Sequence, residues 1–65
     1  MLLKEEVQDI ILQTTKDMVS GEIDANDKEE FLEACVELLF ERYQEGMYKF
    51  DTYLKLAHIL SEELY

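Results

Sequence analysis

The residues best suited to chemistry in this 65-residue chain are its single cysteine, Cys35, and its single histidine, His58. A thiol and an imidazole act as a nucleophile and general base only when they lie within hydrogen-bonding distance. At helical spacing Cys35 falls within an apolar arc, whereas His58 falls on the polar side of a later segment. The sequence therefore predicts a buried structural thiol and a solvated imidazole, with no catalytic residue and no enzymatic activity.

The potential metal ligands do not follow a known pattern. One cysteine and one histidine at unrelated positions lack the spacing of zinc ligands. Asp24 and Asn26 occupy the first and third positions of a possible calcium loop, but Glu29 stands where the tight turn requires glycine. Cys35 stands where a bidentate glutamate is required. We expect a helix cap in this segment, no bound metal and no cofactor.

The ending Ser61-Glu62-Glu63-Leu64-Tyr65 resembles the SQELD signature of the small helical phosphatases that act on sporulation response regulators, with three of five positions matching. Tyr65 stands where that family carries an acidic residue that matters to its proposed chemistry. The resemblance implies a phosphatase, which ranks third among the functions considered for this chain.

Acidic residues dominate the charge of the chain, with 16 acidic and 6 basic residues and a formal net charge of -10. Such a chain lacks the basic face that direct binding to nucleic acid requires, and anionic membrane surfaces repel it. Its longest runs without a charged residue hold six residues, whereas a membrane-spanning helix needs about 20. The acidic start does not fit a signal peptide, and a lone cysteine favours a reducing compartment. We expect a cytoplasmic protein.

The acids are concentrated in residues 22–45, which carry -7 of the net charge of -10. On a helical wheel six of them form one acidic stripe opposite the apolar arc: Asp27, Glu30, Glu33, Glu37, Glu41 and Glu45. The stripe contains no lysine or arginine. Its length of about 27 Å gives roughly one charge per ~5 Å, comparable with ~3.4 Å per charge along one DNA strand. Like charges at this spacing destabilise a helix.

Two interpretations of the acidic stripe remain open. It is either the solvated face of a highly charged protein, or an interface for a basic surface on another protein. The absence of compensating lysines favours the interface, because mixed charges also give solubility. We expect an intracellular regulator or inhibitor of a basic protein, including a nucleic-acid-binding protein that it would engage as a nucleic-acid mimic. In size and charge the chain resembles the small acidic inhibitors encoded by bacteriophages and mobile elements.

Glycine positions and hydrophobic periodicity predict the elements that position these residues. The chain has no proline, and Gly21 and Gly46 divide it into three similar pieces. Apolar residues recur at three- and four-residue steps, which predicts helices at about 3–20, 27–45 and 51–64. Asn26, with Glu29 three residues later, is the better candidate to cap the second helix, and Asp51 is the candidate for the third. The predicted fold is all-α, a single three-helix bundle with the second helix central.

The apolar surface of the second helix is too wide for one neighbour, because its residues cover an arc of roughly 200°. After the other helices cover this arc, Val36 and Phe40 remain outside, and Ile59 lies on the flank of the third helix. A monomer would expose these residues, so we expect a homodimer formed through them. The principal alternative function is therefore a dimerisation or adaptor module that acts through its apolar surface.

Aromatic residues gather around the second connection: Tyr43, Tyr48, Phe50 and Tyr53. Such a group is typical of a packed corner between two helices. Tyrosines also anchor protein interfaces, and Tyr48 is the one that we expect to reach outward.

Overall fold

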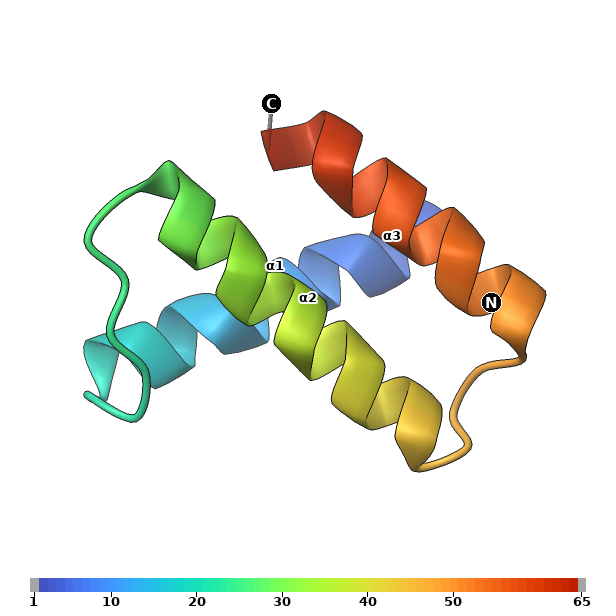
Figure 1. Ribbon diagram of the computed structural model, residues 1–65, viewed down its shortest axis with the longest axis horizontal. Coiled ribbons are helices and arrows are strands. Elements are labelled where there is room, and N and C mark those ends of the chain that lie inside the picture. The colour runs from blue at the N-terminus through green and yellow to red at the C-terminus, as the bar shows by residue number, and fades with distance from the viewer. Residues whose placement is uncertain (1, 65) are drawn as a thin grey trace.

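The computed structural model describes residues 2–64 and contains three helices: α1 (Leu3–Val19), α2 (Lys28–Gln44) and α3 (Phe50–Leu64). α2 and α3 run antiparallel, and α1 crosses behind them (Figure 1). No strand occurs within the described residues. The all-α three-helix bundle is confirmed. α2 contacts both other helices as expected, but α1 and α3 also pack directly against each other, so no helix is the central one.

Two glycines end the first two helices, as the sequence predicts. Gly21 and Gly46 have φ of 85° and 86°, in the left-handed region that glycine enters without steric cost. Beyond them the Glu22 amide donates to the Asp17 carbonyl at 2.9 Å, and the Met47 amide donates to the Arg42 carbonyl at 3.0 Å. These are the bonds of a Schellman motif, which satisfies carbonyl groups left free at a helix end.

The cap of α2 is Asp27, and the prediction of Asn26 is wrong by one residue. The Asp27 carboxylate accepts a hydrogen bond from the Glu30 amide at 2.9 Å, in the geometry of an N-cap. Asn26 instead donates from its side-chain amide to the Glu30 carboxylate at 3.4 Å. Asp51 does not cap α3 either, because that helix begins at Phe50 and Asp51 lies within its first turn.

The core is small and comes from all three helices. Seven side chains are fully buried: Val7, Ile10, Thr14, Cys35, Leu39, Leu56 and Leu60. Thr14 is the polar member of this group, and its hydroxyl donates to the Ile10 carbonyl at 2.8 Å, so that it does not lose a hydrogen bond on burial. No helix of the described chain is long and apolar enough to cross a membrane.

Tyr48 lies against the bundle, and the prediction that it reaches outward is wrong. It is 7% exposed, and its hydroxyl donates to the Glu6 carboxylate of α1. Arg42 of α2 also contacts both Glu6 and the Tyr48 hydroxyl, each at 3.5 Å, and pairs with Asp9 at 3.0 Å. We call these four residues the Arg42 cluster. The turn at Gly46 directs the connection back onto α1, where the hydroxyl finds polar partners.

Candidate protein-binding face on α2

The acidic stripe lies along the outer side of α2. Glu33, Glu37, Glu41 and Glu45 are exposed, as is Asp27, which caps the helix. Glu30 is half-buried and accepts the hydrogen bond from Asn26. The stripe therefore has one end involved in local structure and a longer section, from residue 33 to residue 45, that faces solvent.

The ion pairs of the described residues lie away from the acidic stripe. Within residues 2–64 Arg42 pairs with Glu6 and Asp9, and the His58 imidazole lies 2.8 Å from the Glu62 carboxylate. None of them includes a residue of the acidic stripe. The carboxylates of α2 thus lack a compensating cation in the described part of the chain.

An apolar row lies directly beside the stripe. Val36 is 37% exposed and Phe40 is 44% exposed, as the arc on α2 predicts. An open hollow of about 430 Å³ is lined by Val36, Glu37, Phe40, Glu41, Gln44 and Tyr53, and one of about 360 Å³ by Leu32, Glu33, Val36 and Glu37. The two hollows share Val36 and Glu37. We call the continuous surface formed by these eight residues the α2 groove.

A group of aromatic rings supports one end of the α2 groove. Tyr43 and Tyr53 stack with ring centroids 4.8 Å apart, and Phe40 lies 6.4 Å from Tyr43 and 6.3 Å from Tyr53. Phe50 contacts both tyrosines. The predicted aromatic corner is present, but Phe40 takes the place expected for Tyr48. Because Tyr53 comes from α3, the groove lies where two helices meet.

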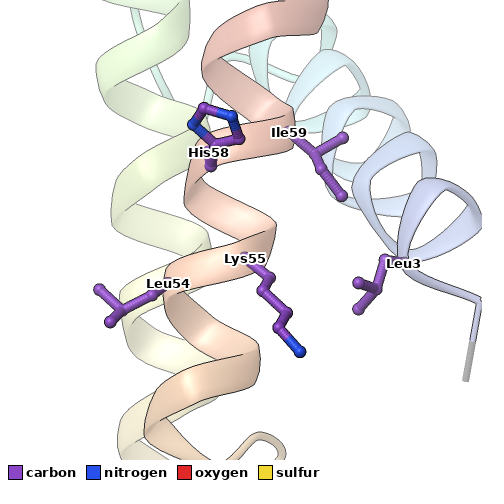
Figure 2. Close-up of a pocket in the computed structure, with 5 residues that line it drawn as sticks. All are labelled: Leu3, Leu54, Lys55, His58 and Ile59. Atoms are coloured by element: carbon purple, nitrogen blue, oxygen red, sulfur yellow. The ribbon is translucent and has the colours of Figure 1, made fainter.

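A second apolar surface lies on α3. Leu3, Leu54, Lys55, His58 and Ile59 line an open hollow of about 400 Å³, the α3 hollow. Figure 2 shows Ile59 pointing toward α1 and Leu3, while Leu54 points to the opposite flank of α3. Of the three residues predicted to mediate self-association, Val36 and Phe40 therefore share the α2 groove and Ile59 lines the α3 hollow.

The cysteine and the histidine lie in different environments. Cys35 is fully buried, and burial raises the pKa of its thiol, against a smaller opposing effect of a hydrogen bond with Thr14. The His58 side chain is 74% exposed. Both placements agree with the sequence, since the thiol belongs to the core and the imidazole to the surface.

The Arg42 cluster is the polar feature that sequence reasoning missed. Its members lie up to 42 residues apart, and the signal available in the sequence was the chain's only arginine. The cluster joins α1 to the end of α2, because both of its carboxylates belong to α1 and pair with Arg42 of α2. Residues 2–64 contain no group of three or more His, Cys, Asp and Glu side chains that could hold a metal ion.

No family model, curated protein or solved structure matches the chain.

Proposed function

We propose that this protein is a small acidic regulator that acts by binding the basic surface of a partner protein through the acidic stripe of α2. The observation that carries the proposal is the exposed section of the stripe, with Glu33, Glu37, Glu41 and Glu45, which forms no ion pair within residues 2–64. Basic groups of a partner would supply the missing cations.

The energetics of α2 support an interface over a merely solvated face. Glu33, Glu37 and Glu41 follow one another at four-residue steps, where like charges cost a helix a few tenths of a kcal/mol per pair. Glu41 and Glu45 lie near the C-terminal end, where the helix dipole also disfavours negative charge. A surface that only maintained solubility would avoid these costs by mixing lysine with glutamate.

The charge spacing favours a partner that normally binds nucleic acid. Along α2 the stripe presents roughly one carboxylate per ~5 Å, in the range of a phosphate backbone. Inhibition by mimicry of nucleic acid, of the kind known for bacteriophage proteins, would use this spacing. We place the protein in the cytoplasm, where the single, buried Cys35 remains reduced.

The test compares Glu33→Lys/Glu37→Lys with Glu62→Lys/Glu63→Lys, a control on α3 that changes the net charge equally. Proteins captured from lysate by each immobilised form are eluted with a salt gradient and quantified. We expect a basic protein that the wild type and the control retain and that the α2 variant releases at lower salt, because charge complementarity governs association. The α2 variant should melt slightly above the wild type, since its lysines attract Glu30 and Glu41. Equal retention by all three forms contradicts the proposal.

A second candidate function is a dimerisation or adaptor module. The observation that favours it is the exposure of apolar side chains on both surfaces, with Phe40 at 44% and Leu54 at 50%. The α3 hollow has no carboxylate in its lining, so two copies could meet there without opposing their acidic stripes. Tyr65, the position at which the chain departs from the phosphatase signature, lies outside the described residues.

A further inference from the structure

The α2 groove combines an apolar floor with a charged rim. Val36 and Phe40 of α2 and Tyr53 of α3 form its floor, and each of the two hollows that compose it includes Val36. Phe40 and Tyr53 are held in place by ring contacts with each other and with Tyr43. The floor is therefore a supported surface that an apolar side chain can contact without rearranging the bundle.

The carboxylates lie along one side of this floor. Glu33, Glu37 and Glu41 line the groove and follow one another at four-residue steps, about 6 Å apart along the axis of α2. The lining that α3 contributes, Tyr53, carries no charge. The groove is thus asymmetric, with acidic groups on the α2 side and an aromatic side chain on the α3 side.

We propose that the α2 groove binds a basic amphipathic helix of the partner protein. A helix lying along α2 would place apolar residues at three- and four-residue steps on Val36, Phe40 and Tyr53. Lysine or arginine residues on one flank, repeating every four residues, would match the carboxylates of the rim. From Leu32 to Gln44 the groove extends about 18 Å, which corresponds to a partner helix of roughly 12 residues.

Charge complementarity favours a basic helix in the α2 groove over a second copy of the chain, a nucleic acid or an acidic peptide. A second copy of the chain, related by a two-fold axis, would oppose Glu33, Glu37 and Glu41 with the same residues of its partner. Nucleic acids and acidic peptides meet the same repulsion. This inference rests on the proposed function and adds to it the secondary structure and the one-sided charge pattern of the bound segment.

Two synthetic 14-residue peptides of identical composition test the inference. One has leucines on a single helical stripe with lysines along one flank, and the other has the same residues in scrambled order. Affinity is measured by fluorescence anisotropy at two salt concentrations, and helix formation by circular dichroism. We expect the patterned peptide to bind the wild type at least roughly tenfold more tightly than the scrambled one and to become helical on binding.

Protein variants separate the apolar floor from the acidic rim. Val36→Ser/Phe40→Ser should remove the preference for the patterned peptide, whereas the control Leu12→Ser, at an exposed residue of α1, should retain it. A single Val36→Ser variant gives the same comparison if the double variant is unstable. Glu33→Gln/Glu37→Gln should weaken the binding of both peptides and reduce its salt dependence.

The outcomes distinguish the inference from the function on which it rests. Equal affinity for the two peptides, lost in Glu33→Gln/Glu37→Gln, overturns the helix-binding groove and leaves the acidic regulator standing. Binding that is unchanged in Glu33→Gln/Glu37→Gln contradicts the regulator itself. Conversion of a dimer to a monomer by Val36→Ser/Phe40→Ser, with peptide affinity unchanged, assigns the groove to a second copy and also overturns the inference.

Discussion

Arg42 shows how one cation can connect parts of a highly acidic bundle. Its side chain is 15% exposed and contacts Glu6, Asp9 and the Tyr48 hydroxyl. Burial alone would lower the pKa of the guanidinium, but its hydrogen bonds and charge interactions with Tyr48 and Asp9 together outweigh this effect and raise the pKa. A guanidinium suits this position because its fixed, planar set of donors can serve several acceptors at once.

Tyr48→Phe should lower the free energy of unfolding by about 1 kcal/mol at neutral pH, the usual net contribution of one hydrogen bond. Urea unfolding measures this change. Tyr43→Phe is the matched control, because the Tyr43 side chain is half-buried and its hydroxyl forms no hydrogen bond within residues 2–64.

Alkaline pH gives a second test at the same residue. Burial raises the pKa of Tyr48 above its ordinary value of 10.0, and Glu6 adds to this effect, whereas Arg42 opposes it. The unfolded chain therefore loses this proton first, so the contribution of Tyr48 to stability is complete below pH 10 and declines as pH rises through the folded-state pKa. Wild type should lose stability more steeply above pH 10 than Tyr48→Phe, and parallel curves would argue against a buried, protonated hydroxyl.

At the scale of the element, α2 differs from its neighbours because its side chains contribute to three different surfaces. One side supplies Cys35 and Leu39 to the core, a second supplies Val36 and Phe40 to the groove, and the outer side carries the acidic stripe. Its wide apolar arc therefore reflects a groove in addition to two neighbouring helices. α2 also begins with a specific cap at Asp27, which contributes to its stability.

Asp27→Ala should lower the free energy of unfolding by about 1 kcal/mol, because it removes the acceptor for the Glu30 amide. Asn26→Ala is the control, since the Asn26 side chain makes only a longer, exposed hydrogen bond to the Glu30 carboxylate. Chemical denaturation of both variants measures the difference. A larger loss in Asn26→Ala than in Asp27→Ala would place the cap one residue earlier.

The helices could be predicted from the sequence because the signals for them are local. Gly21 and Gly46 mark helix ends that need a left-handed residue, and the period of the apolar residues places Cys35 and Leu39 inward. The exposed stripe follows from the same period. The position of Tyr48 could not be predicted, because it depends on Glu6, 42 residues away.

The α2 groove could not be predicted from local sequence patterns. These patterns predict that Val36 and Phe40 are exposed, but the groove takes its shape from Tyr53, which α3 brings beside Phe40. The sequence does not decide which residue caps α2, because Asn26 and Asp27 are both good cap residues and the backbone conformation selects between them.

At the scale of the whole molecule, two apolar surfaces of different electrostatic character lie on one small bundle. The α2 groove has Glu33, Glu37 and Glu41 in its lining, whereas the α3 hollow has Lys55 and His58. A charge of -10 on a chain of 7.7 kDa opposes association of like molecules, most strongly where carboxylates would face each other. Self-association is therefore better suited to the α3 hollow.

We expect the protein to dimerise, so that light scattering at tens of micromolar gives a mass close to twice the 7.7 kDa of one chain. The dimer fraction should rise at high salt, because salt screens the repulsion between the two acidic chains. Ile59→Lys should return the protein to a monomer, because it places a charge in the apolar contact. Val19→Lys makes the same charge change, from an apolar residue to lysine, at a position that is 81% exposed and outside the hollow, and should leave the dimer intact. A mass of one chain at both salt concentrations would refute the dimer.

Because Cys35 is buried, the rate at which its thiol is chemically labelled reports how often the core of the bundle opens. The thiol is fully buried, and its raised pKa keeps it in the unreactive protonated form. An alkylating reagent can therefore modify it only when the core opens, and where reclosing is faster than modification, the labelling rate follows the population of the open state. Since Cys35 is the only cysteine, each labelled molecule records an opening of the same site. A partner that binds the closed bundle would slow this labelling, so the rate would measure occupancy without any tag on the protein.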